Sequence, residues 1–446
     1  MPPLPTSRGR TVLAALTLTW AGAGCRPADD GFAPPEVEDI ERAEVERVVR
    51  TLAADSMRGR RAFTDDALRA AAFIASEFEA SGLATMPGAD GYLQRFMVRS
   101  IRADQAAMSV NGQALPPDRF VVRMGEGTLD WATGAVEPVV VGPDAADAQG
   151  AILGAARAGG DAVVFVHPAH AELFTRFSRF LGGPVRMLGD RSPPTVVLAL
   201  TDADDDASWE VSATAATTEE PLVNVVGMVE GRRPDEYVLF SAHYDHIGVQ
   251  QPQEGDSIAN GANDDASGTT AVIELARYFA ARGTPERSLL FAAFTAEEAG
   301  GYGSRHFSEQ LDPESIVAMF NIEMIGKPAV SGPYTAWITG FERSSFGPLL
   351  QEAVEGTEYE FYPDPYPDQN LFYRSDNATL ARLGVPAHSI STTPIDVDPD
   401  YHRVSDHVET LDLEHMTRTI RAIAMAAEPM IAGEATPTRV DPATVN

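Results

Sequence analysis

Apolar and polar residues follow two different periods in the second half of the chain. Short apolar runs typical of buried strands are separated by stretches in which apolar residues recur every three or four positions, as in helices. The clearest helical stretches are Ser267 to Arg282 and Leu413 to Ala427. The expected strands are Asn224 to Val229, Glu236 to Ala242, Ser288 to Phe294, Ile316 to Asn321, Thr335 to Thr339 and Ala387 to Ile390. Strands that alternate with helices predict a layered α/β domain.

The first half of the chain has a different texture. Residues 37–52 and 65–81 have the apolar spacing of amphipathic helices. From residue 101 to residue 220 the pattern consists of short β-like runs, glycine-rich turns and one helix-like run, Ala148 to Ala158. We interpret residues 101–220 as an inserted, β-rich accessory domain. Its acidic end, residues 201–220, is expected to be a return linker or an exposed loop.

Chain length and net charge limit the number of domains and the kinds of binding partner. A chain of 446 residues is too long for one small core, which favours two domains. Residues 37–100 and 221–432 would form one discontinuous domain, followed by a disordered tail at residues 433–446. The net charge of −31 argues against binding to nucleic acid or to an anionic membrane surface, because a basic footprint is missing.

The first 25 residues have the layout of an export signal. Arg8 and Arg10 precede an uncharged stretch, Thr11 to Gly24, that is too short to span a membrane. Cys25 is the only cysteine, so internal disulfides are excluded, and it follows small residues as in a bacterial lipoprotein box. The alternative is an ordinary cleaved signal peptide. Either way we expect a protein that works outside the cytoplasm, with residues 26–36 as a tether and membrane contact only through a lipid on Cys25.

Histidines and carboxylates follow several of the apolar runs. In an open α/β sheet the loops at the carboxyl ends of the strands converge on one crevice, so these side chains are expected to meet. The candidates are His243, Asp264, Glu297, Glu298, Glu323 and His402. Imidazole and carboxylate groups are zinc ligands, and three carboxylates with a bound hydroxide would bring a site with two divalent ions close to neutrality.

Each candidate also has a purely structural explanation. His243 could be a buried core histidine, although Asp245 is placed to accept a hydrogen bond from its ring. Asp264 could cap a helix, and Glu297 and Glu298 could mark the solvated start of another helix. A metal pair explains the two adjacent glutamates differently. Glu298 would bind the metal, and Glu297 would accept a proton from the attacking water.

Five motifs occur in a fixed order along the chain: Ala-His-Tyr-Asp-His, Ala-Asn-Asp-Asp-Ala-Ser-Gly, Ala-Glu-Glu-Ala-Gly, Asn-Ile-Glu-Met-Ile-Gly and Tyr-His-Arg-Val-Ser-Asp. Together they resemble the ordered motifs of metallopeptidase family 28, which contains di-zinc aminopeptidases and glutamate carboxypeptidases. The resemblance covers residues 37–100 and 221–432. It implies a three-layer α/β/α phosphorylase/hydrolase-like domain with a central mixed sheet. Residues 101–220 resemble, more weakly, a protease-associated domain.

The resemblance also implies roles for single residues. One Zn²⁺ would be held by His243 and Glu323, the other by Glu298 and His402, with Asp264 as the bridge between the two ions. Glu297 would be the general base and then the general acid, and Tyr401 would stabilise the oxyanion. His246 has no ligand role by this resemblance, and the simplest explanation for it is a loop histidine near the site.

The expected function is therefore an exported zinc aminopeptidase that acts on peptides. A dipeptidase or carboxypeptidase of the same family is the first alternative, and peptides with blocked amino or carboxyl ends would separate these specificities. A glutaminyl cyclase would bind about one zinc per chain. A non-catalytic, receptor-like protein would hydrolyse no unblocked peptide. The number of subunits does not follow from the sequence.

Overall fold

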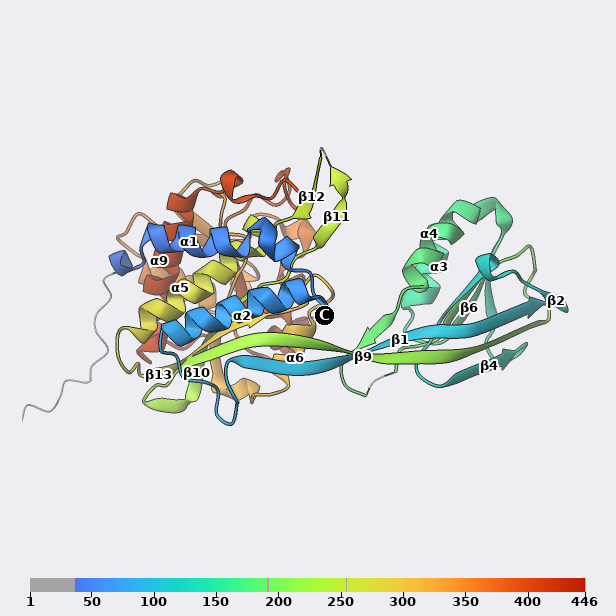
Figure 1. Ribbon diagram of the computed structural model, residues 1–446, viewed down its shortest axis with the longest axis horizontal. Coiled ribbons are helices and arrows are strands. Elements are labelled where there is room, and N and C mark those ends of the chain that lie inside the picture. Colours follow the sequence, from blue (N-terminus) through green and yellow to red (C-terminus); the bar gives the residue numbers. More distant parts are fainter. Residues whose placement is uncertain (1–36, 191, 254, 446) are drawn as a thin grey trace, which may run out of the picture.

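The molecule has two lobes, and two long strands run through both of them (Figure 1). The computed structural model describes residues 37–190, 192–253 and 255–445. Strand β1 (Leu93–Val110) pairs antiparallel with β9 (Trp209–Val229), with one register shift between Asp104 and Ala107. One end of this pair belongs to the main sheet, and the other end packs against a second, smaller sheet. The expected boundaries near residues 100 and 220 therefore fall inside continuous strands.

The main sheet is mixed, with a parallel centre. Its path is β16 (Glu360–Pro363), β15 (Thr335–Ile338), β17 (Ala387–Ser391), β14 (Ile316–Ile322), β10 (Arg233–His243), β13 (Arg287–Phe294), β9, β1 and β2 (Gln113–Ala114). The central strand β10 is parallel to both β13 and β14. Strands β9 and β15 are antiparallel to their neighbours β13 and β17. The carboxyl ends of three adjacent strands thus lie at one edge, where a site can form.

Helices cover both faces of this sheet. Val238 and Phe240 of β10 point into one apolar cluster, and Leu239 points into another on the opposite face. The first face is covered by α1 (Arg42–Leu52), α2 (Asp65–Ala80), α5 (Gly268–Ala280), α7 (Phe346–Ala353) and α9 (Leu413–Ile431). The second face is covered by α6 (Tyr302–Ser308) and α8 (Asn377–Ala381). The predicted three-layer α/β/α fold with a mixed central sheet is confirmed.

The second lobe has its own sheet. Its strand order is β3 (Phe120–Arg123), β8 (Val196–Leu200), β6 (Ala162–Val166) and β5 (Pro138–Val141). One face packs against the far ends of β1 and β9 and against β4 (Thr128–Ala132). The other face is covered by α3 (Ala148–Arg157) and α4 (Ala171–Leu181). Helix α4 was missed from the sequence, because its apolar face depends on a few aromatic residues such as Phe174 and Phe177.

The prediction of a linker or loop at residues 201–220 was wrong for residues 209–220. These residues belong to β9, with Trp209, Val211 and Ala213 buried against the smaller sheet. The side chains alternate in burial, but the many alanines and threonines give a weak apolar signal. The low hydrophobicity of these residues therefore obscured the alternating pattern that predicts a strand.

The prediction of a disordered tail at residues 433–446 was wrong for residues 433–445. Val440 is 1% exposed and packs beneath the second face of the main sheet. Arg439 donates hydrogen bonds to the main-chain oxygens of Ile316 and Pro313 at 2.9 and 3.0 Å. Arg287 likewise reaches the main-chain oxygen of Ala435 at 2.7 Å. Arginine–carbonyl bonds hold this segment, and they leave no periodic pattern in the sequence.

The predicted signal peptide, Cys25 and the tether lie outside the described residues. Within the part of the chain that the structure describes, no helix combines the length and apolar character needed to cross a membrane.

Replacing Val440 with alanine should lower the free energy of unfolding by about 1 to 3 kcal/mol, because it removes two buried methyl groups from a packed contact. Chemical denaturation would measure this change. Glu434→Ala is the matched control, because Glu434 lies in the same segment and is exposed. Equal stability of the Val440 variant and the parent would show that the segment does not contribute to the fold.

Candidate metal centre

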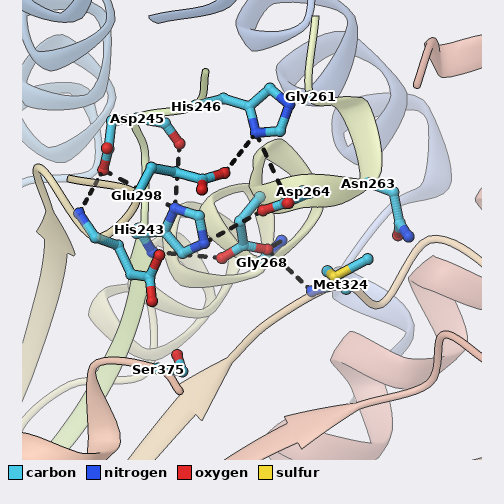
Figure 2. A network of polar contacts seen from close by, with 12 residues as sticks. His243, Asp245, His246, Gly261, Asn263, Asp264, Gly268, Glu298, Met324 and Ser375 are labelled. Carbon is cyan, nitrogen blue, oxygen red and sulfur yellow. Dashed lines mark hydrogen bonds and ion pairs between the residues drawn. The ribbon is translucent and has the colours of Figure 1, made fainter. Parts of the chain in front are cut away.

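The predicted ligands come from neighbouring strand ends and loops. His243 is the last residue of β10 and is buried, and Glu298 and Glu323 follow the parallel strands β13 and β14. Asp264 lies in the turn Ala262–Ser267 that leads into α5. His402 lies on a loop after β17, and its side chain is 39% exposed. Figure 2 shows His243, Asp264 and Glu298 directed toward a common centre.

Asp264 stands between two histidines. Its Oδ1 lies 3.4 Å from Nε2 of His243, and its Oδ2 lies 3.2 Å from Nε2 of His402. Glu298 contributes Oε2 at 3.2 Å from the same nitrogen of His402. The two oxygens of Asp264 therefore serve two different partners, which is the arrangement that a bridging carboxylate requires.

Burial and neighbouring charges shift the pKa values of these groups. Burial opposes protonation of His402, but its contacts with Asp264 and Glu298 raise its pKa to about 10. Burial raises the pKa of Glu323 to about 7 and that of Glu297 well above its usual range. Burial would also raise the pKa of Asp264, but His246, His243 and His402 bring it well below its usual value. Protons therefore compete with any cation for this cluster.

The donor set fits divalent metal ions. Oε2 of Glu323 is buried and has no hydrogen-bond partner among the described residues, and buried Oε1 of Glu298 faces only Nδ1 of His246, at 2.9 Å. Unpaired buried carboxylate oxygens are costly unless a positive charge lies nearby. Histidine nitrogens combined with carboxylate oxygens are a donor set that zinc prefers. The structure thus brings four of the predicted ligands, His243, Asp264, Glu298 and His402, into contact with one another. Glu323 lies close enough to interact electrostatically with His243 and Asp264.

Asp245 has a different geometry from the one expected. The nearest acceptor for Nδ1 of His243 is the main-chain oxygen of Asp245 at 3.1 Å, whereas its carboxylate Oδ1 is 3.9 Å away. That Oδ1 accepts a hydrogen bond from the main-chain N–H of Glu297 at 3.0 Å. The predicted carboxylate–imidazole bond was therefore wrong. Asp245 orients His243 through its main chain and positions the loop of Glu297 through its side chain.

Tyr401 lies beside His402, with the two rings stacked at 4.0 Å between centroids. Burial and the neighbouring carboxylates raise the pKa of its phenol, so the hydroxyl keeps its proton and can donate a hydrogen bond. The side chain of Arg374 approaches this hydroxyl at 3.4 Å. The predicted oxyanion donor thus lies directly next to a predicted metal ligand.

Sequence reasoning missed a set of groups that hold the ligand loops. Asp265 accepts hydrogen bonds from the main-chain N–H groups of His243 and Met324 at 3.3 and 3.0 Å. Asp406 accepts the N–H of Asp264 at 3.0 Å. Arg60, which is 0% exposed, donates to main-chain oxygens of Tyr244, Asn260 and Gly261 at 2.6 to 2.8 Å. No spacing rule indicates these contacts, because they join segments up to about two hundred residues apart.

Lys327, the only lysine of the chain, supports the loop that carries His402. Its Nζ forms ion pairs with Asp398 and with Asp400, the latter at 2.8 Å. Asp400 also accepts a hydrogen bond from Ser405 at 2.7 Å. The loop on both sides of Tyr401 and His402 is therefore tied to the segment that follows Glu323.

The layered fold and this cluster define an α/β protein with a candidate metal centre at the carboxyl ends of its parallel strands. Residues 224–427, which include all five predicted ligands, match the sequence profile described as "Peptidase family M28". The predicted resemblance to this family is therefore confirmed for these residues.

Individual relatives agree with this assignment. The chain is 27% identical over 212 residues to leucine aminopeptidase 1 of Trichophyton rubrum, covering 45% of this chain and 56% of that protein. It is 36% identical over 108 residues to a probable zinc metalloprotease of Pyrenophora teres, covering 24% of this chain and 23% of that protein. A zinc aminopeptidase from Bacillus subtilis has the same fold, with a TM-score of 0.55, 17% identity and coverage of 89% of this chain and 97% of that chain. The match thus spans about half the length of the first of these relatives.

Lys327→Met should weaken metal binding at the position of His402 by about 10- to 100-fold, because supports behind a ligand have effects of this size. Competition with a chromogenic chelator would measure the affinity. Arg403→Met is the matched control, since it removes a positive charge from an exposed side chain on the same loop. Equal affinities in Lys327→Met and the parent would show that the ion pairs do not position His402.

Proposed function

We propose that this chain is a zinc-dependent aminopeptidase that uses two Zn²⁺ ions and removes residues from the amino end of peptides. The observation that carries the proposal is the division of the two Asp264 oxygens between His243 and His402 beside the Glu297-Glu298 pair. His243 and Glu323 would hold one ion, and Glu298 and His402 the other, with Asp264 shared. When bound, the zinc ions supply Lewis-acid activation of water and of the substrate carbonyl.

The chain's own residues provide the proton transfers. Burial raises the pKa of Glu297, which suits a group that must take a proton from water and then release it to the leaving amine. Asp245 fixes the main chain of Glu297 at 3.0 Å and so positions this base. The protonated hydroxyl of Tyr401 would donate a hydrogen bond to the oxygen that becomes negative during attack.

The surroundings of Glu323 support recognition of an amino-terminal residue. Trp337, Leu371 and Ile395 line a pocket that also contains Glu323 and Tyr401. An apolar wall would accept an aliphatic side chain, and the buried acids beside it would attract the positively charged α-amino group. This arrangement is the reason to test leucine substrates first.

The protein is expected to hydrolyse leucine p-nitroanilide and unblocked leucyl peptides, to lose this activity with a metal chelator and to regain it with Zn²⁺. Amino-acetylated forms of the same peptides should be resistant, because the charged amino group is lost. Cleavage of amino-acetylated peptides only at a free carboxyl end would favour a carboxypeptidase, and one zinc per chain with cyclisation of amino-terminal glutamine would favour a glutaminyl cyclase. Failure of the zinc-loaded protein to hydrolyse any unblocked peptide would favour a non-catalytic protein.

Glu297→Gln should retain both metals and lower the turnover number by about 10²- to 10⁴-fold, because the amide cannot accept the proton. Steady-state kinetics and metal analysis on the same sample would test this. Glu298→Gln is the contrasting variant, since it should weaken metal binding itself. Unchanged turnover in Glu297→Gln would exclude Glu297 as the general base.

We also propose export of the protein, on the basis of the signal-like residues 1–25, and anchoring through Cys25 if that residue is lipidated. Fractionation of cells that produce the parent and Cys25→Ser would distinguish a lipoprotein from a released protein.

Nothing in the charge of the chain favours nucleic acid as a partner, because the net charge is −31.

A further inference from the structure

His246 lies inside the candidate metal centre, although its motif gives it no role there. Its Nδ1 is 2.9 Å from Oε1 of Glu298 and 3.8 Å from Oδ2 of Asp264. The residue is 1% exposed, and Figure 2 shows its ring directed toward both carboxylates. Donor atoms of these three residues all lie within 4.8 Å of one another. His246 therefore adds an imidazole nitrogen to the side of the centre where Glu298 lies.

The polar atoms of this contact are not satisfied by hydrogen bonds. Neither ring nitrogen of His246 makes a hydrogen bond of good geometry with a described residue, and Nδ1 and Oε1 of Glu298 face each other only as an ion pair at 2.9 Å. Buried imidazole nitrogens are normally paired, and leaving them unpaired is costly. Two ligands bonded to one zinc ion at about 2.0 to 2.2 Å lie about 3 to 3.5 Å apart, which accommodates the observed 2.9 Å contact. Both atoms thus have the spacing of ligands that share one cation.

The protein holds the ring of His246 in place by packing. Gly261 has a positive φ of 57°, and a Cβ at this position would lie 2.5 Å from Cγ of the His246 ring. Only glycine allows the loop to approach the ring so closely. The main-chain oxygen of Gly261 accepts a hydrogen bond from buried Arg60 at 2.8 Å. The ring also packs edge-on against His402, at 5.8 Å between centroids.

We propose that His246 is a metal ligand at the position of Glu298, in addition to Asp264 and His402. This inference rests on the proposed metal-dependent function of the site. It gives the two metal positions different numbers of protein ligands. The position of Glu298 has four protein ligands, whereas the position of His243 has Glu323 and the shared Asp264 besides His243 itself. The position of Glu298 should therefore fill first and bind more tightly.

The test uses the full chain, stripped of metal and titrated with Zn²⁺ or Co²⁺. The parent should bind two ions in two resolved steps. His246→Gln should weaken the tighter step by at least about tenfold and narrow the gap between the steps. His407→Gln is the matched control, because His407 is a partly exposed histidine whose ring contacts Asp256 at 3.4 Å rather than the cluster. Unchanged affinities in His246→Gln would overturn the proposal.

A second measurement has its deciding result in the parent protein. In the Co²⁺-loaded parent, each coordinating histidine carries one exchangeable ring N–H that is shifted by the paramagnetic ion. Three such proton signals are expected, from His243, His402 and His246, and one should be absent in His246→Gln. Only two signals in the parent would mean that His246 merely supports Glu298, and would overturn the proposal. Absence of any metal binding by the parent would instead contradict the proposed function as a whole.

Discussion

The concentration of buried negative charge at the carboxyl ends of β10, β13 and β14 is the constraint on which the rest of the structure depends. Asp245, Asp264, Asp265, Asp376 and Asp406 are each no more than 2% exposed. Carboxylates removed from water either become protonated or need compensation from donors and cations. The strand ends bring these groups together, so the loops around them must supply that compensation. The surrounding sequence is arranged to do so.

The compensation comes in two forms. Main-chain N–H groups point at Asp265 and Asp406, which removes part of the cost of burying these carboxylates and fixes the turn that carries Asp264. Arg60 is fully buried, and it donates to main-chain oxygens rather than to a carboxylate. Burial lowers its pKa, while Asp406 and Asp264 act in the opposite direction. Its charge thus stabilises the acids from a short distance and leaves their oxygens available as ligands.

Much of the fold and of the ligand set could be predicted from the sequence, for a physical reason. Ligands at strand ends follow apolar runs, and His243, Glu298 and Glu323 are each marked by such a run. The hydrogen bond of Asp245 was mispredicted and the burial of His246 was not predicted, because both residues lie in the loop after β10. Their roles depend on the path of that loop, which Arg60 and Gly261 fix across a separation of about two hundred residues. A local pattern contains no information about such contacts.

The accessory lobe lines part of the cleft beside the candidate metal centre. Strands β1 and β9 continue without interruption from the main domain to the face of the smaller sheet, which couples the lobes more firmly than a flexible linker would. On β7 (Val185–Met187), which pairs with β1, the guanidinium of Arg186 lies 4.1 Å from the ring centroid of Phe63 and pairs with Glu220 at 2.6 Å.

The main-chain oxygen of Arg186 accepts a hydrogen bond from Tyr302 at 2.9 Å, and Tyr302 begins the helix that follows the Glu297-Glu298 loop. Arg186, His246 and Glu298 all line one cavity of about 650 Å³. A displacement of the lobe would therefore change the wall of the cleft within a few residues of a predicted ligand. The accessory lobe therefore forms part of the wall of the site. The contact between Arg186 and Tyr302 links it to the loop that carries Glu298.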